Sequence, residues 1–280
     1  MLMLMLVPVF SGCSSVRLAY GNGPQLVWWW VDGYVDFSRE QAPVVRQGID
    51  KLFEWHRSTQ LPELIPLLVS AQAQVLEPIT PALACRWQDD IRGKLDAALD
   101  RALDLAADMV PSLGEAQFKS LEKRYAKSIA EMRDDFLQPD PVKRRRESVQ
   151  RALERAEFLY GSLDEAQKRV ISAGVAASPF DPEAWLAERL RRQRDTLQTL
   201  RRLVAEKADR DQRLAALRTL VVRLERSPEP EYRAYQQRLS DYNCALAAQV
   251  HNATTLAQRR RGRETLKGWE DDLRALIGGA

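Results

Sequence analysis

Apolar side chains recur at steps of three and four residues along most of this chain, and this pattern restricts the fold more than any other feature. The clearest example steps 3, 4, 4, 3, 4 through Phe118, Leu121, Tyr125, Ile129, Met132 and Phe136. Such steps place all six side chains on one face of an amphipathic helix. No stretch shows the alternation of period two that a half-buried strand needs, so we expect an all-α fold.

Start and stop signals divide the first two thirds of the chain into short helices. Pro111 ends the helix that carries the apolar residues from Trp87 to Ala102. Asp140-Pro141 supplies an N-cap and a first helical residue, and Gly161 is a typical stop. We therefore predict a part made of short helices over residues 25–178.

The last third reads as a long helical hairpin over residues 179–280. After Asp181-Pro182, apolar residues continue to Leu224 with no proline or glycine until Pro228. About 45 residues at about 1.5 Å each would give a helix of roughly 65–70 Å. The apolar seam weakens around Ala208-Asp209, where a break is an alternative. A return run of similar length reaches Leu276, which predicts antiparallel packing of the two runs.

The first twelve residues are almost entirely apolar and are followed by Cys13. This stretch is too short to span a bilayer and fits the core of a signal peptide. Ser11-Gly12 before Cys13 forms a lipobox, so we predict a lipoprotein signal peptide over residues 1–12 and lipidation of Cys13. Phe10, three residues before Cys13, and the lack of a basic residue before Arg17 are unusual for a lipoprotein signal peptide. The alternatives are an ordinary signal peptide and a buried strand with an incidental cysteine.

The predicted lipobox also predicts where in the cell the protein lies. Residues 13–24 would form a lipidated tether, and the helical body would face the periplasm. Ser14 rather than Asp follows Cys13, which favours the outer membrane. The lipid on Cys13 would then be the contact with the membrane.

Two further cysteines, Cys85 and Cys244, would lie in an oxidising compartment. A disulfide between them would close a loop of roughly 160 residues, worth on the order of 4 kcal/mol in the chain-entropy model. Two buried free thiols are the alternative, because the sequence shows no geometry.

A short pattern recurs at expected helix starts: an apolar or small residue, a capping residue, two others and a glutamine. The cap oxygen accepts a backbone N–H, and the glutamine reaches back to the N–H of the cap. The pattern resembles the Leu-Thr-x-x-Gln motif of the Spy/CpxP periplasmic chaperones, although capping alone would also produce it. The copies are Phe37–Gln41, Leu163–Gln167, Thr254–Gln258 and, in degenerate form, Leu113–Gln117.

Longer stretches resemble an uncharacterised family of Gram-negative lipoproteins that is classed as a domain of unknown function. The resemblance spans nearly the whole chain and implies a single helical lipoprotein architecture, without a known reaction or cofactor. The stretches are Ser11–Cys13 with Arg17–Tyr20, Trp28–Asp36, Trp55–Arg57 with Gln60–Pro62, Arg124–Tyr125, Asp134–Leu137, Ser178–Glu183 with Trp185, and His251–Thr255.

Trp28, Trp29 and Trp30 form the most suggestive surface candidate. Consecutive helical residues point about 100° apart, so three indoles cannot all face one core. Either the helix is buried on most sides, or at least one indole contacts a membrane surface or a partner. With His56 and His251 as the only histidines, and without paired cysteine spacing, we expect no metal site.

Composition excludes some function classes. Net charge is only +3, so no bulk charge points to nucleic acid. The basic runs Lys143–Arg146, Arg191–Arg194 and Arg259–Arg261 are typical of solvated helix faces, although arginines there could also bind the phosphates of anionic lipids.

No nucleophile elbow, phosphate loop or His-Glu-x-x-His motif is present, so we expect no enzyme and no cofactor. We predict an envelope lipoprotein that binds proteins or envelope components through helical surfaces, with a chaperone-like activity. A structural or assembly adaptor with one specific envelope partner is the alternative.

Overall fold

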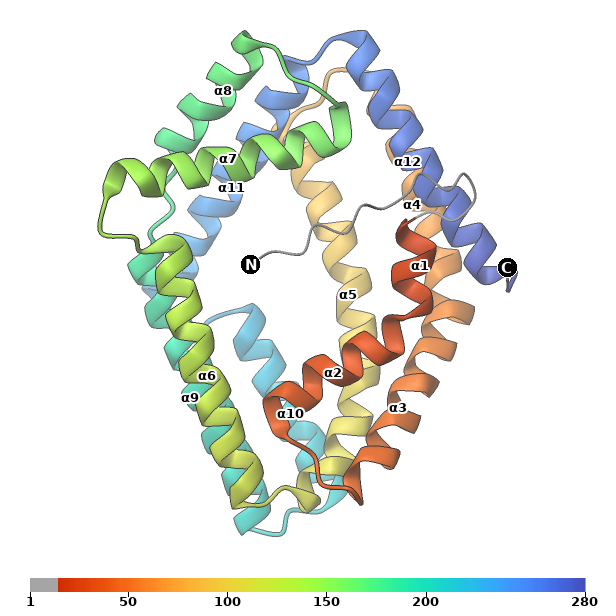
Figure 1. The fold of residues 1–280 in the computed structure, drawn as a ribbon, viewed down its shortest axis with the longest axis vertical. Helices are drawn as coiled ribbons and strands as arrows, with labels where there is room; N and C mark the ends of the chain where they lie inside the picture. Colours follow the sequence, from red (N-terminus) through yellow and green to blue (C-terminus); the bar gives the residue numbers. More distant parts are fainter. Residues whose placement is uncertain (1–14, 280) are drawn as a thin grey trace, which may run out of the picture.

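The computed structural model describes residues 15–279, and the described residues are helical and form no strand, which confirms the all-α class (Figure 1). The signal segment 1–12 and Cys13 lie outside the described residues. The helices are α1 Ser15–Gly21, α2 Gly23–Val35, α3 Gln41–Trp55, α4 Leu61–Gln74, α5 Pro81–Met109, α6 Glu115–Phe136, α7 Pro141–Tyr160, α8 Glu165–Ala176, α9 Pro182–Ala205, α10 Arg210–Glu225, α11 Pro230–Asn252 and α12 Leu256–Ile277.

Two groups of upright helices are joined by crossing ones. The helices α6 and α9 lie side by side, as do α4 and α12, and α2 crosses between α3 and α6 (Figure 1). At the other end, α7 and α8 pack together, and α7 reaches across to α12. None of the described helices is long and apolar enough to span a bilayer.

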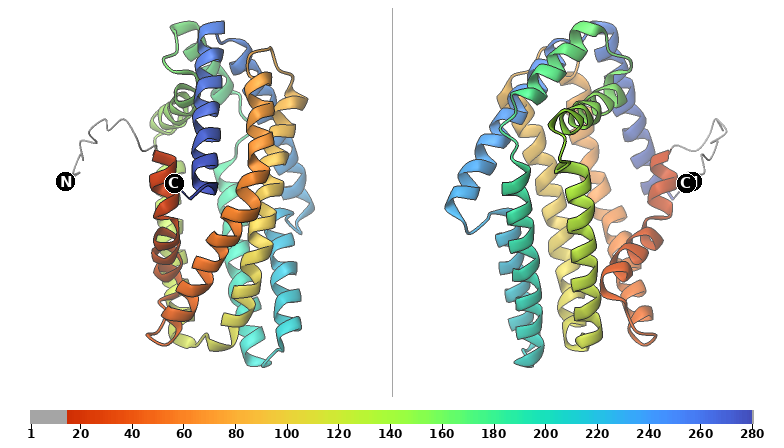
Figure 2. Two further views of the ribbon diagram at one scale, coloured as in Figure 1. Left: turned by 90° about the vertical axis from the view of Figure 1, so that its right-hand side faces the viewer. Right: turned by 60° about the vertical axis from the view of Figure 1, so that its left-hand side comes forward.

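The helices α3 and α4 form one rod, which the side views show clearly (Figure 2). A π-helical turn, His56–Gln60, joins them. Pro62 lacks an N–H and its ring crowds the carbonyl four residues earlier, so a regular α-helical turn cannot form there. The hydroxyl groups of Ser58 and Thr59 bond to carbonyls in the preceding turn.

The expected unbroken helix after Pro182 is wrong, and the alternative of a break around Ala208-Asp209 is confirmed, because the chain turns between Ala205 and Arg210. Lys207 adopts a left-handed conformation with φ of 51°, and Ala208 is buried. Asp209 then starts α10 with a capping box: its Oδ1 accepts from Gln212 N, and Gln212 Oε1 accepts from Asp209 N, both at 2.9 Å. This pair is a fifth copy of the helix-start pattern, and the pattern would have located the break.

The expected hairpin over 179–280 is also wrong. Instead, α9 pairs with α10, α11 packs on α5 and α8, and α12 packs on α4. The parts 25–178 and 179–280 therefore interleave in one body. The physical reason is that α5, the longest described helix, offers apolar surface to both α10 and α11.

The tether expected over residues 13–24 is largely helical in the described part. The helix α1 packs on α12, with Arg17 Nε 3.2 Å from Asp272 Oδ1. Tyr20 places its hydroxyl 2.9 Å from His56 Nδ1 and its ring edge-on to Phe53. These contacts fix the chain to the body within a few residues of Cys13.

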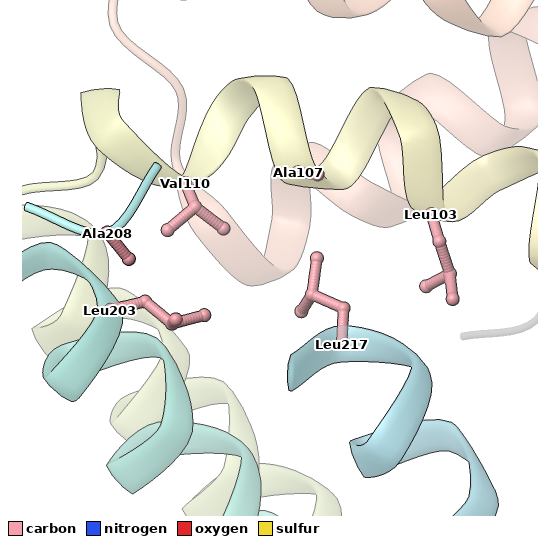
Figure 3. Packing of buried hydrophobic residues seen from close by; sticks show 6 residues of the cluster. All are labelled: Leu103, Ala107, Val110, Leu203, Ala208 and Leu217. Carbon is pink, nitrogen blue, oxygen red and sulfur yellow. The ribbon is translucent and has the colours of Figure 1, made fainter. Parts of the chain in front are cut away.

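One hydrophobic cluster holds α5, α9 and α10 together (Figure 3). Ala107 is fully buried, and its small side chain lets the helices approach closely. Around it lie Leu103, Val110, Leu203, Ala208 and Leu217. Burial of each leucine stabilises the fold by roughly 1.5–3 kcal/mol.

Candidate functional site

The three consecutive tryptophans of α2 divide between the core and the surface. Trp28 is buried, stacks on Phe37 and has the Arg46 guanidinium 4.3 Å from its ring centre. Trp29 and Trp30 are 61% and 63% exposed, and Leu26 beside them is half exposed. We call Leu26, Trp29 and Trp30 the α2 face.

Cys85 and Cys244 form a disulfide between α5 and α11, with their Cα atoms 5.3 Å apart. Both cysteines pack in a cluster with Ile79, Ala84 and Ala248. The bond joins residues 159 positions apart, so it connects two helices that the sequence had placed in different parts of the chain.

Both histidines have structural partners. His251 is 1% exposed, and its Nε2 lies 2.8 Å from the carbonyl oxygen of Glu77. A carbonyl only accepts, so Nε2 carries the proton and Nδ1 accepts from the Tyr160 hydroxyl at 2.8 Å. Burial lowers the pKa of His251, and burial also lowers the pKa of His56, so the neutral form of both rings is favoured.

Within residues 15–279, no group of three or more histidine, cysteine, aspartate or glutamate side chains is arranged to hold a metal ion. The ring nitrogens of His251 are both engaged, and His56 uses Nδ1 for Tyr20.

The recurring helix-start glutamines do more than cap their own helices. Asp164 and Gln167 form a complete capping box, as do Thr255 and Gln258. Gln41 Oε1 accepts from Ser38 N at 2.8 Å. Gly114 has no side chain and supplies only its N–H, which Gln117 Oε1 accepts at 3.0 Å.

Each of these glutamines also donates Nε2 to the loop before another copy. The acceptor is always the carbonyl two residues before the partner's capping residue. The motifs therefore pair reciprocally, which ties the start of α3 to that of α6 and the start of α8 to that of α12. The bonds are Gln41 to Ser112, Gln117 to Asp36, Gln167 to Ala253 and Gln258 to Ser162.

An apolar groove of about 410 Å³ lies between α4, α5 and α12. Its walls are mostly aliphatic and aromatic, and Arg86 and Asp90 supply its charges. The Trp87 indole donates to Gln74 Oε1 at 2.6 Å, which fixes one wall. The remaining main lining residues, which with Trp87 we call the apolar groove, are Leu64, Leu67, Leu68, Leu83, Ile91, Leu266, Trp269 and Leu273.

The groove continues as a stripe along α5. Ile91 and Leu95 are 60% and 65% exposed, and Leu99 is also exposed. These residues are four apart, so they follow one face of the helix. Sequence reasoning missed this surface because a period-four stripe looks the same whether a neighbour covers it or not.

Comparison with known proteins adds one finding. A family model, described as a family of unknown function (DUF6279), matches residues 33–233. No curated protein and no solved structure matches the chain. The matched region includes the paired motifs of α3 and α6, Cys85, and the α5 stripe.

Proposed function

The chain belongs to the DUF6279 family, and from this premise we propose that it is a non-enzymatic envelope lipoprotein that holds apolar segments of other proteins in its apolar groove. The observation that carries the proposal is the groove between α4, α5 and α12, which runs into the uncovered stripe of Ile91, Leu95 and Leu99. Contiguous exposed apolar surface of this kind marks binding sites on soluble domains.

The energetics favour weak, reversible capture. Each large apolar side chain that enters the groove gains roughly 1.5–3 kcal/mol from burial. Association and ordering of the bound segment cost several kcal/mol in return. A segment with two or three apolar residues would therefore bind transiently, as a chaperone of the holding type requires.

Lipid attachment at Cys13 supplies the membrane contact in this proposal and places the body at the outer membrane, facing the periplasm. Radiolabelled palmitate is expected to enter the protein in its native host, and Cys13→Ala is expected to abolish the label. Cys85→Ala serves as the control and should retain it. Label that persists in Cys13→Ala would show that the lipid is elsewhere.

The groove is tested with charged substitutions on its exposed side. The purified chain should suppress light scattering by a chemically denatured client. The double variant Ile91→Asp/Leu95→Asp should need at least tenfold more protein for half suppression, because a loss of about 1.4 kcal/mol in binding is tenfold. Both positions are exposed, so the fold should persist.

Leu256→Asp is the matched control, since this leucine is also exposed but lies in the first turn of α12. It should suppress scattering like the wild type. No suppression by the wild type at molar excess would rule out the holding activity. If Leu256→Asp lost as much suppression of light scattering as Ile91→Asp/Leu95→Asp, the apolar groove would not be the binding site.

A specific adaptor is the second candidate, and the α2 face favours it. Two exposed tryptophans beside an exposed leucine resemble the aromatic anchors that dominate protein interfaces. A photo-crosslinker at Trp30 in the native host separates the two functions. One dominant adduct supports an adaptor, and many adducts support a chaperone.

A further inference from the structure

We propose that a second site, at the junction of α7 with α6, α8, α9 and α11, binds a small amphiphile that carries a phosphate group. The site is a cleft of about 920 Å³. This size falls in the range of small-molecule sites, roughly 300–1,000 Å³. We call it the basic cleft, and its charged lining residues are Arg144, Arg145, Arg151, Arg155 and Glu183.

The arginines of the basic cleft differ from those arginines of the described chain whose charges are paired with carboxylates. Arg201, Arg210 and Arg218 each bond to one or two carboxylates. Among residues 15–279, none of the four cleft arginines forms a salt bridge. Arg144 donates to the carbonyl of Gln138, and Arg151 donates to the Ser148 hydroxyl, so their charges stay uncompensated.

Four like charges on one helix repel each other, and helical spacing brings three of them to the same face. Arg144, Arg151 and Arg155 are seven and four residues apart, which places these three on one face of α7, and Arg145 beside them also lines the cleft. The nearby acids do not neutralise them. Glu183 stands alone in the lining, and Asp140 and Asp181 accept N–H bonds at the starts of α7 and α9. An anionic ligand would relieve this repulsion.

The floor of the cleft is aromatic. Phe136, Phe180 and Trp185 contact one another edge to face, with ring centres 5.0–6.2 Å apart. The Arg151 guanidinium sits 4.6 Å from the centre of the Phe136 ring, where it joins the charged wall to the apolar floor. A ligand that fits both surfaces has an anionic head and an apolar body.

Phosphate suits the charged wall better than a single carboxylate does. A guanidinium offers parallel N–H groups that match two phosphate oxygens, and several arginines can share one phosphate. The same chemistry could come from an anionic phospholipid or from a soluble phosphate ester. The apolar floor predicts tighter binding of the lipid.

The test is calorimetric titration of the full purified chain with three probes. Dihexanoyl phosphatidylglycerol below its micellar concentration represents the lipid, glycerol phosphate the soluble ester, and hexyl glucoside a neutral amphiphile. We expect the lipid to bind at least tenfold more tightly than glycerol phosphate, and hexyl glucoside not to bind. Equal affinity for glycerol phosphate would overturn the amphiphile and assign the phosphate site to a soluble ester.

The matched variants use arginines of the same helix, α7. Arg145 and Arg155 are exposed, so Arg145→Ala/Arg155→Ala should fold normally, which a thermal melt checks. This variant should weaken lipid binding at least tenfold. Arg146→Ala should bind the lipid like the wild type, because Arg146 does not line the cleft. Its Nη2 lies 3.8 Å from Glu147 Oε1.

Three further results would overturn the proposal. The first is that neither phosphate probe binds, and the second is that hexyl glucoside binds as tightly as the lipid. The third is that Arg146→Ala weakens lipid binding as much as the double variant does. Trp185→Ala adds a separate check of the floor. This substitution should weaken the binding of the lipid at least fivefold and leave the affinity for glycerol phosphate unchanged.

Discussion

Replacing Cys85 and Cys244 together by alanine is expected to lower the free energy of unfolding by about 4 kcal/mol. The disulfide joins residues 159 positions apart, so without it the unfolded chain gains the freedom of a very long loop. The folded state loses little, because α11 keeps its packing against α5. Urea unfolding of the oxidised wild type and of the double variant measures the difference.

A reducing agent provides the control for this prediction. It should destabilise the wild type by nearly the same amount and leave the double variant unchanged, since Cys85 and Cys244 are then absent. Equal unfolding midpoints for the wild type and the variant would contradict the prediction. In the periplasm, where disulfides persist, this bond would stabilise the protein in its proposed location.

The sequence predicted where helices begin and end far better than which helices touch. Asp164 with Gln167, and Thr255 with Gln258, form the expected capping boxes, and Gly161 ends α7 with φ of 77°. These signals are local, because the cap and its partners lie within four residues. Asp209 with Gln212 carries the same signal, so the break between α9 and α10 was readable.

Helix partners and helix coverage depend on distant residues, which no local pattern specifies. The seam in α11 predicted a partner within the last third, but α5 holds this helix. The apolar residues from Trp87 to Ala102 predicted one amphipathic helix, but Ile91, Leu95 and Leu99 on this helix are exposed in the structure. A three-and-four periodicity shows which face is apolar and does not show what packs on it.

Basic runs show the same limit. The runs at 143–146 and 191–194 look alike, and both read as solvated faces. In the structure, Arg144 and Arg145 line the basic cleft, whereas Arg191 and Arg192 turn inward to the carboxylate of Glu188. The two runs differ because the buried carboxylate of Glu188 binds Arg191 and Arg192, and the contribution of this carboxylate to stability can be measured.

Glu188→Ala is expected to lower the free energy of unfolding by about 3 kcal/mol. Glu188 is 4% exposed and accepts bonds from Arg191 Nε, Arg191 Nη2 and Arg192 Nε, each at 2.8 Å. Its carboxylate also accepts from the buried Ser227 hydroxyl at 3.1 Å, which holds the turn between α10 and α11. The alanine variant leaves two arginines and a buried hydroxyl without this partner. Urea unfolding at pH 7 measures the loss.

Lowering the pH should reduce the difference in the free energy of unfolding between the wild type and Glu188→Ala. Burial alone raises the pKa of Glu188, but the hydrogen bonds and charges of Arg191 and Arg192 outweigh burial and hold the pKa below its usual range. A carboxylate with a lowered pKa stabilises the fold fully above its unfolded pKa, about 4.3 for glutamate. That stabilisation disappears as the pH falls through the lower folded value, so the gap between the wild type and Glu188→Ala should narrow below about pH 4.

Glu122→Ala is the control for Glu188→Ala, since Glu122 bonds to Arg201 at 2.9 Å in an exposed pair. Solvent screens such a pair, so its loss should cost less than about 1 kcal/mol. If Glu188→Ala cost no more than Glu122→Ala, the desolvation penalty of the buried carboxylate would cancel its bonds. The turn at Ser227 would then depend on helix packing alone, and α11 would reach α5 without help from this network.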